Sequence, residues 1–329
     1  MTARHHVLAI GNALVDVITT APPEFLVERG IAKGSMRLIP ADESETLYAA
    51  MGPGREISGG SAANTVAGMA ALGAKPAFVG RVADDQFGKV FAHDIRAAGV
   101  TYTTASSAGG DPTGRCLIVV TPDGERTMST YLGACQELSE ADLDADSVAA
   151  AEILYLEGYL WDPLVPRAAM KKAIEVARAN NRKVAFTLSD VFCVEGHRAD
   201  FQELLKSHVD LVFGNEHEVC ALYQTNSIDA AMAELAQHSV IAVVTRSSAG
   251  AVVLEGGRRH VISGESVAKV VDSTGAGDMF AGGFMAGMVE GRSLPDCARI
   301  GCITAAEIIS HYGARPEADL KALVKAKLG

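Results

Sequence analysis

The glycine-rich sequence Asp272-Ser273-Thr274-Gly275-Ala276-Gly277-Asp278 indicates a strand-to-helix turn of an α/β fold. An apolar segment at 268–271 precedes it and predicts a strand, and the small-residue segment 279–289 that follows predicts a helix. The glycine loop should therefore lie where helical N–H groups lack intrahelical partners and carry the positive end of the helix dipole. Gly275, Ala276 and Gly277 could then bind a phosphoryl group, and Asp278 could accept the proton of an attacking hydroxyl.

Taken alone, the Gly-x-Gly-Asp pattern also fits a tight strand-to-helix turn whose Asp only stabilises the first helical turn. Other motifs narrow the choice. The chain has no Gly-x-x-x-x-Gly-Lys-[Ser/Thr] motif and no His-Arg-Asp loop, which argues against a P-loop enzyme and a protein kinase. The residues at 11–14 lack the dinucleotide-binding glycine pattern, which argues against a dehydrogenase.

Short apolar segments alternate with alanine-rich segments of helical spacing along the chain. This alternation predicts an α/β fold in which helices cover both faces of a mainly parallel sheet. The expected strands are 6–10, 77–82, 153–156, 184–188, 211–213 and 240–245, and the expected helices are 64–72, 87–98, 165–180 and 228–238. A hairpin is expected from 251–254 and 260–263.

Two stretches break the alternation, and we expect them to form a small discontinuous β lid over the ligand cleft. They cover approximately 14–40 and 113–131, and the second has the pattern of a hairpin around 121–125. No linker separates them from the rest, so residues 1–329 are expected to form a single domain made of an α/β core and this lid.

The composition limits the partners and the compartment. The chain has 40 acidic and 29 basic residues, a net charge of -11 and no Lys/Arg cluster, so nucleic acid is not an expected partner. Any phosphate must be bound by local groups and a metal ion. Six cysteines without a Cys-x-x-Cys pair favour the cytoplasm, and the lack of a bilayer-spanning apolar run argues against a membrane protein.

Three motifs in order give the chain a resemblance to the ribokinase (PfkB) family of carbohydrate and nucleoside kinases. They are Gly59-Gly60-Ser61-Ala62-Ala63-Asn64, Asn215-Glu216-His217-Glu218 and Gly275-Ala276-Gly277-Asp278. The resemblance covers essentially the whole chain. It implies a ribokinase-like, three-layer Rossmann-type core and transfer of the ATP γ-phosphoryl group to a primary sugar hydroxyl under a closing lid, with Mg²⁺ required.

Within the family, Gly11-Asn12-Ala13-Leu14-Val15-Asp16 is similar to the opening motif of the adenosine kinases. The resemblance implies that Asp16 binds both ribose hydroxyls, that Asn12 lies beside the base, and that Gly59, Gly60 and Asn64 contact the ribose. A carboxylate suits a vicinal diol because both hydroxyls can donate to it. Without the resemblance, Asp16 would be an ordinary strand-end residue and Asn64 part of a capped helix.

The resemblance also implies a lid arginine and a purine pocket. Arg126 is similar to the arginine that reaches the transferring phosphate, although a solvated hairpin arginine is an equal alternative from the residues alone. Positions that would contact adenosine are Cys116, Met128, Phe192 and Tyr159 or Leu160. Core packing remains an alternative for each of them.

The resemblance assigns the nucleotide and its metal ions to three further segments. Asn215 would approach the ATP phosphates and Glu218 would order water on Mg²⁺, while the same pair fits a helix-capping box. Thr245, Arg246 and Gly250 belong to a nucleotide loop in which Ser247 replaces a family glycine. Asp272 and the Thr274 carbonyl would bind a monovalent cation such as K⁺.

The leading hypothesis is therefore conversion of ATP and adenosine to ADP and AMP, by a monomer or a homodimer. The alternative is a ribokinase-like or fructokinase-like sugar kinase that uses the same base and anion hole. A third hypothesis is a non-catalytic nucleoside-binding regulator, because a fold alone does not establish a function.

Overall fold

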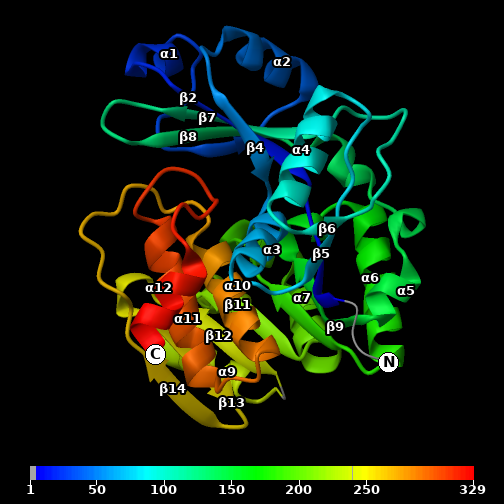
Figure 1. The fold of residues 1–329 in the computed structure, drawn as a ribbon, viewed down its shortest axis with the longest axis vertical. Helices are drawn as coiled ribbons and strands as arrows, with labels where there is room; N and C mark the ends of the chain where they lie inside the picture. The colour runs from blue at the N-terminus through cyan, green and yellow to red at the C-terminus, as the bar shows by residue number, and fades with distance from the viewer. Residues whose placement is uncertain (1–4, 239) are drawn as a thin grey trace.

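The computed structural model describes residues 5–238 and 240–329, which form two β-sheets surrounded by helices (Figure 1). Within these residues, the larger sheet has nine strands in the order β14-β13-β12-β11-β10-β9-β1-β5-β6. The pairs from β12 to β6 are parallel, and β12–β13 and β13–β14 are antiparallel. The strands are β1 (His5–Ile10), β5 (Pro76–Val79), β6 (Thr101–Tyr102), β9 (Ala151–Glu157), β10 (Lys183–Thr187), β11 (Leu211–Asn215), β12 (Ile241–Thr245), β13 (Ala251–Glu255) and β14 (Arg258–Ile262).

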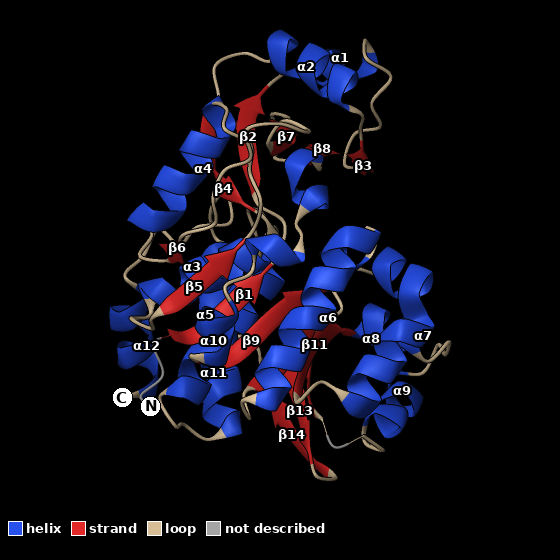
Figure 2. Ribbon diagram, turned by 90° about the vertical axis from the view of Figure 1, so that its right-hand side faces the viewer, coloured by secondary structure: helices blue, strands red, loops and turns tan. Residues whose placement is uncertain are grey.

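Helices cover both faces of this sheet, so the expected three-layer α/β core with a mainly parallel sheet is confirmed (Figure 2). Side chains alternate along β1: Val7 and Ala9 pack in one apolar core with α3, α10 and α11, whereas Leu8 and Ile10 pack in another with α5 to α9. The helices of the core are α3 (Ser61–Ala71), α5 (Ala145–Ala149), α6 (Leu164–Ala179), α7 (Val191–Ser207), α8 (Glu216–Leu222), α9 (Ile228–Leu235), α10 (Ala276–Val289), α11 (Leu294–Ile308) and α12 (Leu320–Leu328).

A second sheet lies beyond the carboxyl ends of the core strands, at the top of Figure 1. Its order is β3-β8-β7-β2-β4, and the expected hairpin within 113–131 is confirmed as the antiparallel pair β7–β8. The strand β4 also joins this sheet, although it lies outside the two ranges expected from the sequence. The elements here are β2 (Leu14–Thr20), β3 (Met36–Leu38), β4 (Arg55–Gly59), β7 (Gly114–Val120), β8 (Arg126–Tyr131), α1 (Pro23–Val27), α2 (Ala41–Ala50) and α4 (Gln86–Ala97).

One expected strand is wrong. Residues 268–271, which precede the glycine loop, have no strand conformation, and Val270 is 55% exposed. The edge of the sheet is already formed by the expected hairpin, which is confirmed as β13 and β14. The segment instead runs past the end of α11, where the N–H of Val271 donates to the carbonyl of Ile309 at 2.8 Å. Among the described residues, no helix combines the length and apolarity needed to cross a bilayer.

Gly60 makes the junction between the two sheets possible. It lies between β4 and α3 with a φ of 102°, in a region that favours glycine, and an added Cβ would overlap the carbonyl oxygen of Asn12. The backbone that leaves β1 and the backbone that enters α3 can therefore come into contact. This contact brings the start of α3 to the carboxyl end of the core sheet.

We predict that Gly60→Ala lowers the free energy of unfolding by about 1 to 3 kcal/mol, because alanine is strained at this φ and collides with Asn12. Urea denaturation followed by circular dichroism measures the change. Gly196→Ala in α7 is the matched control, since nothing lies within 4 Å of its added Cβ. Equal effects of the two substitutions would contradict the prediction.

Candidate active site

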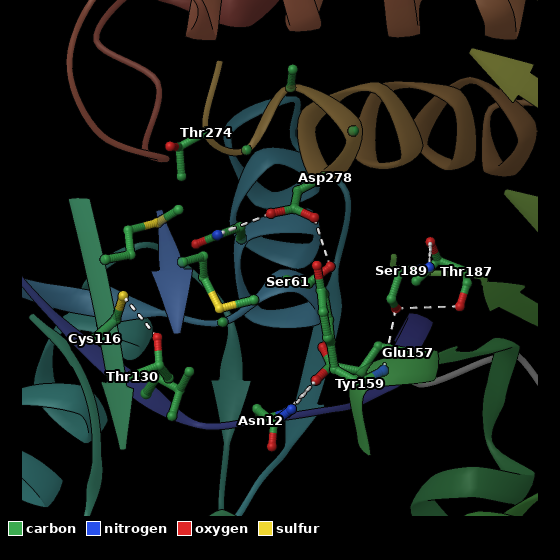
Figure 3. Close-up of a pocket in the computed structure, with 18 of the residues that line it drawn as sticks. Asn12, Ser61, Cys116, Thr130, Glu157, Tyr159, Thr187, Ser189, Thr274 and Asp278 are labelled. Carbon is green, nitrogen blue, oxygen red and sulfur yellow. Dashed lines mark hydrogen bonds between the residues drawn. The ribbon is translucent and has the colours of Figure 1, made fainter. Parts of the chain in front are cut away.

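A cavity of about 680 Å³ lies between the two sheets, at the carboxyl ends of the core strands. Figure 3 shows Asp278 at its top, Cys116 and Thr130 on one side and Tyr159 and Ser189 on the other. The predicted site residues that line it are Asn12, Asp16, Gly60, Asn64, Cys116, Met128, Tyr159, Phe192, Asn215, Glu218, Thr245, Thr274, Gly275, Ala276, Gly277 and Asp278. Those outside its wall are Gly59, Arg126, Arg246, Gly250 and Asp272.

Asp278 lies in the first turn of α10, at the edge of the cavity. The helix begins after Gly275, whose φ of 77° is left-handed, and no side chain caps it. The Oδ1 atom of Asp278 accepts a hydrogen bond from the Ser61 hydroxyl at 2.6 Å, and Oδ2 accepts one from the Asn64 amide at 3.0 Å (Figure 3). Each oxygen retains a lone pair, so the carboxylate can still accept a hydrogen bond from a ligand.

The loop before α10 offers fewer free donors than the sequence suggests. The N–H of Ala276 donates to the carbonyl of Ser273 at 3.2 Å, and the first helical bond runs from Met279 to Gly275 at 2.8 Å. Gly277 has open space around the position of an added Cβ. The backbone there can therefore be approached closely by an anion.

A second carboxylate, Asp16, enters the cavity from β2. Its side chain is buried, and burial raises its pKa to about 6, against the opposing charges of Arg315 and Arg126. Gly59 pairs opposite Leu14, and an added Cβ at Gly59 would collide with the Asp16 carboxylate. Gly59 thus leaves space for Asp16 without lining the cavity itself.

Asn12 is bound to a buried acid that the sequence analysis missed. Glu157, at the end of β9, accepts hydrogen bonds from the Asn12 N–H at 2.8 Å and from its side-chain amide at 2.7 Å. The other oxygen of Glu157 accepts from the N–H of Ala62 at 2.8 Å, and burial raises the pKa of Glu157 to about 7. An acid directly after the apolar strand 153–156 was the available signal, since ligand sites gather at such strand ends.

The cavity has apolar side chains on two sides, one from the second sheet and one from the core. Cys116 and Met128 come from β7 and β8, and Tyr159 and Phe192 come from the opposite, core side, with ring centroids 5.9 Å apart. Phe192 is 47% exposed, so its ring is available for contact with a ligand. A flat aromatic group would fit between the two sides.

The segment 215–218 forms the capping box that is one of its two predicted roles. The Asn215 side chain accepts from the Glu218 N–H at 2.9 Å, and Glu218 accepts from the Asn215 N–H at 3.0 Å. Glu218 is buried and lines the cavity, and burial raises its pKa to about 7. Capping does not prevent this carboxylate from facing a ligand.

The loop after β12 turns tightly between Thr245, which lines the cavity, and Gly250, which does not. The N–H of Arg246 donates to the Gly250 carbonyl at 2.7 Å, and its guanidinium pairs with Glu216 at 2.7 Å. Ser247 adopts a left-handed φ of 51°. Serine thus takes the conformation that the glycine of the related motif would favour.

Arg126 is paired with Asp272 rather than directed into the cavity. One guanidinium nitrogen bonds the Asp272 carboxylate, which also accepts from the N–H groups of Thr274 and Gly313, each at 3.0 Å. The remaining Arg126 nitrogens, Nε and Nη2, are buried without a hydrogen-bond partner among the described residues. This pair joins β8 of the second sheet to the loop before α10.

The two predicted metal sites differ in how their carboxylates are already bonded. Oδ2 of Asp272 accepts from Arg126 and from the Gly313 N–H, whereas Oδ1 accepts only from the Thr274 N–H and retains a lone pair that a monovalent cation could use. Glu218 lines the cavity, and its two oxygens accept one bond each, from the N–H and from the side-chain amide of Asn215. The described residues contain no group of three or more His, Cys, Asp or Glu side chains that could enclose a metal ion. A lone carboxylate fits Mg²⁺, which commonly keeps several waters and binds substrate phosphates.

Besides Glu157, the cavity wall includes polar residues that the sequence analysis did not single out: Ser61, Thr130, Asp162, Thr187, Ser189 and Ser273. Ser189 has a left-handed φ of 71°, and its hydroxyl accepts from the N–H groups of Gly158 and Tyr159 at 2.8 and 3.3 Å. Ser61 lies inside the motif at 59–64, so its position could have been inferred from the helix start. Ser189 carried no comparable signal.

Comparisons of the sequence and of the structure with known proteins point to the same family. Residues 30–320 match the pfkB family of carbohydrate kinases. The solved structure of an adenosine kinase from Sinorhizobium meliloti is 48% identical, with a TM-score of 0.92 over 99% of this chain and 100% of that one. The "probable sugar kinase protein" from Rhizobium etli is 46% identical, with a TM-score of 0.93 over 99% of both chains. Adenosine kinase 2 of Arabidopsis thaliana is 27% identical over 93% of this chain and 94% of its own length.

We predict that Ser247→Gly stabilises the protein by about 0.5 to 1 kcal/mol, because glycine removes the strain of a left-handed serine and loses part of that gain to backbone entropy. Ser248→Gly, one residue on, is the control and should destabilise slightly. Thermal unfolding of the three proteins checks both signs. A lower stability of Ser247→Gly than of the wild type would show that the conformation at 247 is not strained.

Proposed function

Because this chain belongs to the pfkB family of carbohydrate kinases, we propose that it transfers the γ-phosphoryl group of ATP to the 5′-hydroxyl of adenosine. The family establishes ATP-dependent phosphoryl transfer to a hydroxyl, and the proposal concerns the acceptor and the residues. The observation that carries it is the placement of Asp278 and Asp16 in one cavity with an apolar wall of aromatic and sulfur-containing side chains. The relatives named adenosine kinase in Sinorhizobium and Arabidopsis support the same acceptor.

The two ends of the cavity suit the two halves of a nucleoside. The ribose diol would donate to the Asp16 carboxylate, with Asn64 and the Gly60 backbone beside it. The purine would pack between Phe192 and the sulfur atoms of Cys116 and Met128. The 5′-hydroxyl would then face Asp278.

Asp278 would act as the general base. Its ionised form is needed, and burial raises its pKa while the hydrogen bonds from Ser61 and Asn64 and the charge of Arg315 oppose that rise. These groups keep the carboxylate available to accept the 5′-hydroxyl proton. The backbone at 275–277, at the start of α10, would stabilise the negative charge on the transferring phosphoryl group.

The phosphate side of the cavity would be formed by Thr245, Asn215 and Glu218. Glu218 would contact Mg²⁺ through water, and this ion would neutralise charge on the ATP phosphates. A monovalent cation such as K⁺ would be held by Oδ1 of Asp272, which accepts only from the Thr274 N–H, and by the Thr274 carbonyl.

We propose that the second sheet acts as the lid of the domain, with ranges 14–40 and 113–131 and with β4 added. The Arg126–Asp272 pair lies where this sheet meets the loop before α10. For Arg126 to contact the transferring phosphate, it would exchange Asp272 for a phosphate oxygen, which a guanidinium binds equally well. The free state of all six cysteines supports the cytoplasm as the location.

A sugar kinase is the second candidate. The 46% identity to the Rhizobium etli protein named as a sugar kinase favours it, and so does Glu157, a further carboxylate in the cavity wall. Both candidates use Asp278 in the same way, and they differ in what fills the apolar side of the cavity.

We predict that Asp278→Asn lowers kcat by roughly 10²-fold or more, because the amide keeps the shape of the side chain but cannot accept the hydroxyl proton. A coupled assay of ADP release measures kcat, and calorimetry with adenosine should report nearly unchanged binding. Asp296→Asn, in the first turn of α11, is the matched control and should retain activity. Turnover near that of the wild type in Asp278→Asn would remove Asp278 from this role.

We predict that adenosine has a higher kcat/KM than ribose or fructose, and that 2′-deoxyadenosine is a markedly poorer substrate. Deleting one hydroxyl leaves a buried lone pair of Asp16 unsatisfied at a cost of about 1 to 3 kcal/mol, or roughly a 5- to 150-fold loss. Ribose additionally loses the contacts of the purine. In Asp16→Asn, the discrimination against the deoxy compound should shrink.

If ribose or fructose is the better substrate, the adenosine assignment fails and the sugar-kinase candidate replaces it. The role of Asp278 is unaffected by that outcome, since both acceptors need a base. The two predictions therefore test the substrate and the mechanism separately.

A further inference from the structure

Arg315 links the segment between α11 and α12 to the opposite side of the site. It is 251 residues away from Asn64 in sequence, yet one of its guanidinium nitrogens, Nη1, donates to the Asn64 side-chain oxygen. Its Nη2 donates to the Ser58 hydroxyl at 2.8 Å, and that hydroxyl donates to Asp94 at 2.6 Å. Arg315 is not part of the cavity wall that the described residues form.

These contacts fix the orientation of an amide next to the proposed base. A guanidinium can only donate, so the Asn64 atom that faces Arg315 must be its oxygen. The nitrogen of the same amide is then directed to Asp278, where it donates to Oδ2 at 3.0 Å. With the amide reversed, two donors would face each other at Arg315 and an oxygen would face the carboxylate.

The charge of Arg315 acts on both carboxylates, Asp16 and Asp278. It is the strongest of the opposing charges at Asp16, and it also lowers the pKa of Asp278, in each case against desolvation. Asp94 is the acid with the largest effect on Arg315 itself. The Nε atom of Arg315 is buried without a hydrogen-bond partner among the described residues. Burial of this guanidinium therefore carries a desolvation cost.

We propose that Arg315 is a positioning residue for phosphoryl transfer: it fixes the Asn64 amide toward Asp278 and places a positive charge near the two cavity carboxylates. The inference rests on the proposed role of Asp278 but not on adenosine as the acceptor. Arg315 lies outside the cavity wall and acts through Asn64 and through its charge.

The test compares Arg315→Gln and Arg315→Lys with the wild type, by measuring kcat for ADP release from pH 5 to pH 9. Arg315 is the charged group that lowers the pKa of Asp278, and the charge of Asp278 in turn raises the pKa values of four neighbours: Asp16, Glu157, Tyr155 and Tyr159. Removing Arg315 takes away this cation, so the pKa of Asp278 rises. Activity should then disappear at a higher pH as the solution is acidified, by about one pH unit or more.

Arg315→Gln should also lower kcat at the optimum by roughly 10-fold or more, since the amide of Asn64 can reverse. In Arg315→Lys, the acid limb of the pH profile, which is the pH range where activity is lost on acidification, should lie where it does in the wild type. The kcat should recover only in part, because lysine keeps the charge but loses the second donor. Arg115→Gln is the matched control: Arg115 is a buried arginine that bonds Ser44 and packs on Tyr48 and Phe87, away from the cavity. It should change stability without moving the acid limb.

An unshifted acid limb in Arg315→Gln, with a loss of thermal stability like that of Arg115→Gln, would overturn the inference. If adenosine is not phosphorylated, the proposed acceptor fails, and the same profiles are measured with whichever of ribose or fructose releases ADP.

If none of the tested acceptors is phosphorylated, the coupling between Arg315 and Asp278 can be measured by thermal unfolding. Asp278→Asn removes a charge that Arg315 compensates, so it should raise the melting temperature more in the Arg315→Gln background than in the wild type. Equal changes in the two backgrounds would show that the residues are not coupled and would overturn the inference.

Discussion

The buried carboxylate of Glu157 is the constraint on which the site depends. It accepts two hydrogen bonds from Asn12 and one from Ala62, and it thereby joins the end of β9 to the crossing from β1 to β2 and to the first turn of α3. An unpaired carboxylate in this place would cost several kcal/mol, so the three elements hold one relative position. The positions of Asp16 on β2 and Asn64 on α3 follow from it.

The site contains several carboxylates close together in an acidic chain. Two arginines compensate their charge. The charges of Asp272 and Asp278 both raise the pKa of Asp16, and burial raises the pKa values of Asp16 and Asp278. Arg126 comes from the second sheet and Arg315 from the segment after α11, so each contributes a charge from a different part of the fold. Binding of a phosphoryl group thus relies on local geometry, as the net charge of -11 already indicates.

The sequence predicts strands well where both faces of the strand are buried. It predicts a segment poorly where a single tertiary contact determines the conformation. Apolar segments such as 153–156 and 240–245 became core strands because both faces are covered. The segment 268–271 is also largely apolar, but its Val271 N–H bonds the carbonyl of Ile309 after α11 instead of a neighbouring strand. Contacts such as that of Arg315 with Asn64 join residues far apart in the chain, and no local pattern contains them. The roles of the motif residues at the cavity came from family resemblance, since each motif alone also fits a turn or a cap.

The order of the elements has a consequence for synthesis on the ribosome. All core strands precede α10 and α11 in the chain, yet these two helices share with the early helix α3 the covering of the sheet face that carries Val7, Tyr155, Phe213 and Val243. A nascent chain that has already exposed every strand therefore leaves part of that apolar face uncovered until the last helices emerge. The chain is therefore most prone to aggregation or chaperone capture in a late, narrow interval of translation, which slow codons before 276 would lengthen and fast ones would shorten.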